Sequence, residues 1–462
     1  MRIEEFQRML KANSDQQSLP TPPEESILGA AVESHLAPTH TPGISLLVYE
    51  RFLEVFHLRL YSVWPVVSYD ELIAALRNNQ EDYESYSLAA ALCAAVIAQL
   101  RLPEHIVPFN AVSSSEMVAE SQRLRQLFEY QENYSMTSLL TSFFLHIYFA
   151  NAEKLRTAGF YLRETLTYAH GLKLHQPDNY ADMNFREHQL RLRIYWILFV
   201  SERTYCVQNG LPTTLRPINE FPSADPIEGY DGAPLPAFIA LIRLFTFLDG
   251  DILEPTPSSA TVSIQGAPKN QISALQHDLT HHPLSEELDE SQRVDILATR
   301  NWIRILLWQY TITHFPVSCH AKDQAFSALL PAAIAHDTLS VLEKVSWKSI
   351  QPHGYGMELK IFRIADCLLD VLLCAPNSAG TRGLLMDSRQ SLHLLEKVLA
   401  DFGGTDSHFF ATLQKRMVKS QLPVPHALQN DLQISQYSEA DEKKMSTNGT
   451  PDISNGLVGQ TE

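Results

Sequence analysis

The stretch FYLRETLTYAHGLKLH, residues 160–175, decides how the rest of the chain is interpreted. Apolar and small residues recur at helical spacing at Leu162, Leu166 and Ala169, and Gly171 stands where such a helix would end. The pattern therefore predicts one amphipathic helix with an end signal. Helices of this kind occur in tandem helical repeats, in α-helical enzymes and in ligand-responsive regulators, so the stretch alone does not choose among these classes.

Helical patterns continue on both sides of this stretch. From Ile44 the sequence predicts a long helix ended by Pro65, and then a second helix with Ser68 and Glu71 as a capping-box pair at its start. Further helices are predicted at 82–101, 114–130, 135–150, 152–172, 236–253, 289–314, 332–345, 354–374, 387–402 and 406–419. Almost nothing between them resembles two strands joined by a turn. The chain is therefore predicted to be all-α, a multi-helix bundle of packed antiparallel helix pairs.

The two ends of the chain differ in composition from the helical middle. Residues 1–43 contain several prolines among Ser, Thr and Gln without a periodic apolar pattern, which predicts a disordered linker. Residues 423–462 are rich in Ser, Gln, Asn and acids, which predicts a disordered tail. The predicted α-helical region spans 44–422 and is interrupted by a flexible loop at 254–270.

Charge and cysteine usage restrict the classes of function. The chain has 53 acidic and 36 basic residues, a formal charge of −17, and such a surface repels phosphate. Unaided binding to DNA or to an anionic membrane is therefore not expected. The five cysteines are scattered through apolar stretches, which predicts buried thiols in a reducing compartment. The longest apolar runs, 87–100 and 135–150, are too short to span a bilayer, so a soluble intracellular protein is expected.

The sequence contains none of the common catalytic motifs. The sequence lacks G-x-S-x-G, G-x-x-x-x-G-K, H-E-x-x-H and D-D-x-x-D, so we expect no catalytic residue, no cofactor and no enzyme activity. The best metal candidate is the group His277, His281 and His282, because histidines at i and i+4 share a helix face. Beside a Pro- and Ser-rich loop such histidines are commonly just solvated, and no metal site is expected. His170 and His175 flank a helix end, where a structural role is favoured.

The stretch FREHQLRLRIYWILFVSERTYCVQNGLPTTL, residues 185–215, is more informative. Glu187 and Arg191 have the spacing of a helical ion pair, an apolar run carries Trp196, and Glu202 and Arg203 place two charges directly after that run. Charges that interrupt a buried helix need partners. They form either an ion-pair network that fixes the helix register or the wall of a ligand pocket.

The order of these segments resembles the middle homology region of fungal zinc-cluster transcription factors. It consists of a helix ending in LTYAHGLKLH, a short loop, an Arg-x-Arg-Ile-Tyr-Trp helix, an acid–Arg pair and a Gly-x-Pro step. The matching residues are Ala169, Leu172, Leu174, His175, Arg191, Arg193, Trp196, Glu202, Arg203, Gly210 and Pro212. The resemblance covers roughly 44–400 and is strongest to the branch that regulates starch, maltose and sucrose use. It makes the helix with Trp196 the expected partner of the 160–175 helix.

One departure from that family changes the expected mechanism. Its members usually begin with six cysteines, C-x2-C-x6-C and its repeat, that bind two zinc ions beside a DNA-reading basic region. Here no cysteine precedes Cys93, and residues 1–43 contain Arg2, Arg8 and Lys11 as their basic side chains. The zinc ligands and DNA contacts therefore cannot be carried over. The expectation is a nuclear transcription regulator without its own zinc cluster, acting through a zinc-cluster relative or a second copy of itself.

The candidate partner surface is the apolar face of the entry helix, with Phe52, Val55, Phe56 and Leu60. Packing of these side chains within the domain is the alternative. The candidate site residues are Arg191, Arg193, Trp196, Glu202 and Arg203. Two other classes of function stay open, a helical protein-interaction scaffold and an α-helical enzyme without recognised motifs.

Overall fold

The computed structural model describes residues 43–102, 112–225, 227–248, 269–281, 288–374, 382–404 and 407–420. The predicted linker lies outside these residues apart from Gly43, and the whole predicted tail lies outside them. The loop predicted at 254–270 also lies outside them up to residue 268.

Helices make up the regular structure of the described ranges. They are α2 Leu46–Arg59, α3 Tyr69–Asn78, α4 Tyr83–Gln99, α5 Ser114–Arg125, α6 Met136–Asn151, α7 Leu155–Gly171, α8 Phe185–Asn209, α9 Leu235–Thr246, α10 Lys269–His281, α11 Glu290–His314, α12 Leu330–Leu342, α13 Trp347–Ile350, α14 Gly354–Cys374, α15 Arg382–Gly403 and α16 His408–Lys419, with short 3₁₀ turns between some of them. The described residues form no strand, only two isolated β-bridges. The all-α prediction is confirmed.

Most helix starts follow the capping residues in the sequence. Ser113 and Glu116 form a reciprocal capping box at α5, and Ser68 accepts a hydrogen bond from the Glu71 amide at the start of α3. The end predicted for α2 was wrong. The amides of Leu60 and Tyr61 both donate to the Phe56 carbonyl, which closes the helix well before Pro65. Helix α5 likewise ends earlier than predicted, and α10 was not predicted.

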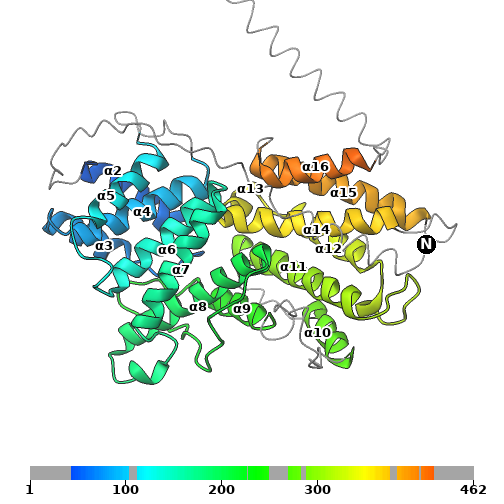
Figure 1. The fold of residues 1–462 in the computed structure, drawn as a ribbon, viewed down its shortest axis with the longest axis horizontal. Helices are drawn as coiled ribbons and strands as arrows, with labels where there is room; N and C mark the ends of the chain where they lie inside the picture. The colour runs from blue at the N-terminus through cyan, green and yellow to red at the C-terminus, as the bar shows by residue number, and fades with distance from the viewer. Residues whose placement is uncertain are drawn as a thin grey trace, which may run out of the picture.

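Two apolar cores hold the helices together. The larger core is formed mainly by α2–α9, and the smaller one by α11, α12 and α14–α16. Helix α11 contributes to both, with Trp302 and Ile303 in the larger core and Ile305 and Trp308 in the smaller. Figure 1 shows α2–α7 on one side of the molecule and α12–α16 on the other, with α11 below α14. No described helix is long and apolar enough to cross a bilayer.

A buried polar junction joins the two halves. The Gln99 side-chain amide donates to the Pro352 carbonyl at 2.8 Å and accepts from Asn151 at 2.7 Å, and the Tyr355 amide donates to Asn151 at 3.1 Å. Gly354 lies at the centre with φ +47°, and a Cβ there would overlap the Gln99 side chain. The ends of α4 and α6 are thereby fixed to the start of α14.

The partner predicted for the 160–175 helix needs correction. Helix α7 packs mainly against α6, and touches α8 over a smaller area. The link from α6 to α7 is residues 152–154, so α7 turns directly back along α6. A short connection favours contact between neighbouring helices, which is why α6, and not the helix with Trp196, covers most of the apolar face of α7.

Candidate functional site

The candidate site residues lie on α8 and face the chain that follows it. After Gly210, whose φ of +61° lets the chain leave the helix, residues 211–225 and 227–231 run back along α8. We call these residues the return segment. Its direction follows from two hydrogen bonds. The Thr214 amide donates to Glu202 near the end of α8, whereas the Ser223 amide donates to Gln189 near the beginning of the helix.

Glu202 fixes the first part of the return segment to α8. Its carboxylate is fully buried and accepts hydrogen bonds from the Thr214 amide at 2.7 Å, the Thr214 hydroxyl at 2.7 Å and the Leu215 amide at 2.9 Å. Arg163 of α7 completes the arrangement with an ion pair at 3.1 Å and a second bond to the Pro212 carbonyl at 2.9 Å. With these donors in place, Glu202 acts as an anchor between two helices and the return segment.

Arg203 holds the return segment at the same place as Glu202, and Trp196 holds it further along the chain. The Trp196 indole donates to the Glu220 carbonyl at 2.8 Å and stacks on Phe221, with ring centroids 5.0 Å apart. Arg203 is fully buried, lies with its guanidinium carbon 3.3 Å from the centroid of the Phe199 ring, and donates to the Leu215 carbonyl at 3.2 Å. Both residues therefore contact the return segment directly.

The two remaining candidates occupy different positions. Arg191 lies 6.0 Å from the centroid of the Tyr180 ring, and the ion pair expected with Glu187 does not form. Arg193 is fully buried, and its guanidinium carbon lies 5.6 Å from the centroid of the Tyr230 ring. Burial lowers the pKa of Arg193 from its ordinary value. The structure thus brings Trp196, Glu202 and Arg203 to one part of the return segment and Arg193 to another.

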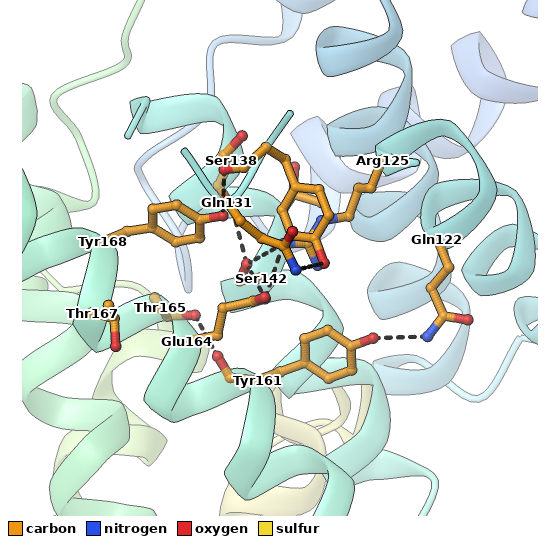
Figure 2. Close-up of polar contacts among 12 residues, drawn as sticks. Gln122, Arg125, Gln131, Ser138, Ser142, Tyr161, Glu164, Thr165, Thr167 and Tyr168 are labelled. Carbon is orange, nitrogen blue, oxygen red and sulfur yellow. Dashed lines mark hydrogen bonds and ion pairs between the residues drawn. The ribbon is translucent and has the colours of Figure 1, made fainter. Parts of the chain in front are cut away.

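A second buried polar cluster joins α5, α6 and α7 (Figure 2). Arg125 is 3% exposed and donates to Glu164 at 2.9 Å and to the Ser142 hydroxyl at 3.1 Å. Ser142 in turn donates to Glu164 at 2.7 Å, and the Arg125 guanidinium lies 3.9 Å from the centroid of the Tyr130 ring. Each helix supplies a member, so the cluster fixes the positions of all three.

The sequence did not predict Arg163, Arg125 or Glu164 as site residues. Arg163 and Glu164 are adjacent on α7 yet point to different partners, Glu202 on α8 and Arg125 on α5, each 39 residues away. A charged residue on an amphipathic helix is usually solvated, so periodicity gave no signal for these pairings. Only the tertiary arrangement identifies them.

The entry-helix residues proposed as a partner surface lie inside the domain. Phe56 and Leu60 are fully buried in the larger core, Phe52 is 6% exposed, and Val55 is partly buried against that core. They therefore pack within the domain, the alternative given above. The exposed apolar residues of the same helix are Leu47 and Leu58.

The histidine candidates lie at the surface or at a helix end. The His277 and His281 rings are tilted relative to each other with centroids 4.2 Å apart, while His282 lies outside the described residues. Among the residues that the structure describes, no three metal-binding side chains converge. The His170 and His175 rings are 5.1 Å apart at the end of α7. The His170 Nδ1 atom lies 2.8 Å from the Leu166 carbonyl.

Ser291, His353 and Asp295 lie together but lack the geometry of a hydrolase triad. His353 Nε2 is 3.0 Å from the Ser291 carbonyl, so it must carry a proton and cannot accept one from the Ser291 hydroxyl. That hydroxyl instead donates to the Ser349 carbonyl at 2.9 Å. Asp295 is 3.7 Å from His353 Nδ1 and is paired with Lys360 at 2.7 Å. The cluster connects α11, α13 and α14 and is not arranged for nucleophilic attack.

Comparison with known proteins gives a match to one family model. The model of the fungal specific transcription factor domain matches residues 50–221, which run from α2 to the middle of the return segment. The matched range thus contains both buried polar clusters of α5–α8. No solved structure gives a significant match.

Curated relatives match over a wider range. The chain is 25% identical to the probable sucrose utilization protein SUC1 of Candida albicans, covering 74% of this chain and 68% of that protein. It is 27% identical to the maltose fermentation regulatory protein MAL13 of Saccharomyces cerevisiae, covering 73% and 70%. It is 24% identical to the respiratory transcription factor ZNF1 of the same yeast, covering 70% and 69%. Residues 50–221 are therefore similar to the fungal specific transcription factor domain, in a chain that is similar over most of its length to proteins named for sucrose utilisation and for the regulation of maltose fermentation.

Proposed function

We propose that this chain is a nuclear transcription regulator of genes for sugar utilisation. The observation that carries the proposal is the match of residues 50–221 to a transcription factor domain, with relatives named for sucrose utilisation and for the regulation of maltose fermentation. Among the described residues, the Ser291–His353–Asp295 cluster places Nε2 of His353 3.0 Å from the Ser291 carbonyl, which does not suit a general base for the Ser291 hydroxyl.

We further propose that these 462 residues reach promoters through a protein partner, either a zinc-cluster relative or a second copy of the chain. The formal charge of −17 opposes contact with DNA phosphates, whereas a negatively charged surface favours encounter with a basic partner face. The first cysteine of the sequence is Cys93, so residues 1–92 contain no ligand set for a zinc cluster. In this mechanism the partner supplies the recognition of DNA sequence.

The regulatory role is tested by deleting the gene in its own host and measuring transcripts during growth on sucrose, maltose and glucose. We expect transcripts for sugar uptake and cleavage to change on at least one of the two disaccharides and to recover when the gene is restored. Unchanged transcripts on all three sugars would contradict the proposed function.

Partner-mediated binding is tested separately. The purified protein should show no salt-dependent, sequence-selective affinity for promoter DNA, whereas the tagged protein in nuclei should occupy promoters together with a zinc-cluster protein or a second copy of itself. Selective binding by the purified chain alone at physiological salt would contradict the partner mechanism. Recovery from nuclei always alone, without promoter occupancy, would contradict it as well.

A further inference from the structure

Two arginines of α8 converge on one aromatic ring of the return segment. Arg186 and Arg193 are seven residues apart and therefore lie on the same face of the helix. Their guanidinium carbons lie 5.7 Å and 5.6 Å from the centroid of the Tyr230 ring. Two positive charges thus flank a single tyrosine at the end of the return segment.

The donor groups of these arginines are poorly satisfied. All three guanidinium nitrogens of Arg193 are buried without a hydrogen bond, and so is Nε of Arg186. The groups that act on Arg193 are the phenols of Tyr61 and Tyr230 and, at longer range, the Asp231 carboxylate, and no carboxylate of the described residues lies within ion-pair distance of its guanidinium. Arg186 is different, because its Nη2 pairs with Glu71. A fully buried guanidinium without a paired anion is costly, and native proteins usually supply one.

A surface turn lies over Arg193. Residues 227–231 close it with one bridge between Ile227 and Tyr230, and Gly229 in this turn has a φ of +78°. Gly229 is exposed, and Tyr61 holds the far end of the turn through one hydrogen bond to the Asp231 carbonyl at 3.1 Å. Outward movement of this turn would remove the Tyr230 ring from both arginines while Glu202 keeps the rest of the return segment in place.

We propose that Arg193 and Arg186 bind the phosphoryl group of a small ligand when the turn at 227–231 moves outward. A guanidinium presents paired N–H donors that match two phosphate oxygens, and the four unmet donors here are of this kind. The phenol rings of Tyr61 and Tyr230 would border the group attached to the phosphate. The site would make regulation by this chain responsive to a phosphorylated metabolite. This regulatory consequence rests on the proposed function, but binding itself does not.

The binding test uses the full-length purified protein and four solutes. Inorganic phosphate, glucose 6-phosphate, maltose and sodium chloride of matched ionic strength are titrated while the midpoint of thermal unfolding is followed. We expect a saturable rise of the midpoint with inorganic phosphate or with glucose 6-phosphate and no saturable rise with maltose or chloride. An equal response to the two phosphates would identify the phosphoryl group as the whole ligand, and a stronger response to glucose 6-phosphate would assign contacts to the sugar.

Three variants separate this site from general ionic effects. Arg193→Met should abolish the rise, and Arg186→Gln should weaken apparent affinity by about thirtyfold. Arg186 has a 40% exposed side chain, so its variant tests the site even if Arg193→Met does not fold. The control is Arg77→Gln, which removes a 59% exposed arginine from an ion pair with Glu50 and should respond as the natural protein does.

The proposal fails if no phosphate raises the midpoint of the natural protein, or if Arg186→Gln responds as Arg77→Gln does. If no phosphate raises the midpoint, the Arg193→Met variant should also have a higher unfolding midpoint than the natural protein in the absence of any ligand. The reason is that an apolar side chain has replaced an unpaired buried charge. Neither result bears on the transcript measurements that test the proposed function, so the two can fail independently.

Discussion

The backbone amide of Leu215 donates a hydrogen bond to the buried carboxylate of Glu202 at 2.9 Å, across 13 residues of sequence. The same carboxylate receives the Thr214 amide and hydroxyl and the Arg163 guanidinium. Glu202, which directly follows the apolar run, therefore does not disturb α8. It is the point at which α7, α8 and the return segment are joined, so its removal affects three elements at once.

Glu202→Ala should lower the free energy of unfolding by about 3 kcal/mol, because it leaves the buried Leu215 amide without an acceptor and Arg163 without its counter-ion. Urea unfolding followed by circular dichroism measures the loss. Glu50→Ala is the control, since its partner Arg77 is 59% exposed and a surface ion pair contributes less than about 1 kcal/mol. Equal losses in the two variants would show that Glu202 has no anchoring role.

Two glycines near the start of α14 give a matched pair. Gly354→Ala should destabilise the protein by about 2 kcal/mol, because its φ of +47° is strained for alanine and the new methyl group would overlap the Gln99 side chain. Gly356→Ala should stabilise it by up to about 1 kcal/mol, since nothing lies within 4 Å of its Cβ position and alanine favours the helix. The measurement is the midpoint of thermal unfolding of each variant relative to the natural protein. Midpoints of the two variants that shift in the same direction would contradict the prediction.

Most of the helices could be predicted because their signals are local. The range predicted for α14, 354–374, is the one observed, and the Ser113 capping box marks α5. The errors arose where a distant contact overrides a local signal. Pro65 suggested a stop for α2, but the chain leaves the helix after Arg59 so that Leu60 and Trp64 can be buried in the larger core.

The site could be predicted only in part. Glu202 and Arg203 attract attention because charges beside an apolar run need partners, and both are fully buried. The return segment gave no such signal, since its irregular backbone has neither helical nor strand periodicity. Its pairing with α8 depends on tertiary register, so Tyr230 could not be assigned to Arg193 from the sequence.

Stability should depend on pH through His146. This side chain is buried with Nδ1 2.9 Å from the Ala158 carbonyl, and burial lowers the pKa of His146 to about 4. The unfolded chain takes up the proton near pH 6.5 while the folded chain does not. Stability from this group is therefore present above pH 6.5 and is lost as the pH falls toward 4, by about 2 kcal/mol at pH 5.

Urea unfolding at pH 7 and pH 5 should show a smaller difference in the free energy of unfolding for His146→Gln than for the natural protein. The same difference in both would exclude His146 as the source.

Thiol reactivity should follow the burial of the cysteines. Cys93, Cys206 and Cys367 are buried, whereas Cys319 and Cys374 are partly exposed. Burial raises the pKa of Cys367 to about 12 and that of Cys374 to about 12, and it raises the pKa of Cys93 as well. Because the thiolate is the reactive form, a maleimide at neutral pH should label Cys319 first, with Cys374 slower despite its partial exposure. Mass spectrometry of the peptides at successive times gives the order, and the same reaction in urea is the control, in which all five should react at similar rates. Early labelling of Cys93 in the folded protein would mean that α4 opens toward solvent and would contradict the close packing of α4 against α5 and α6.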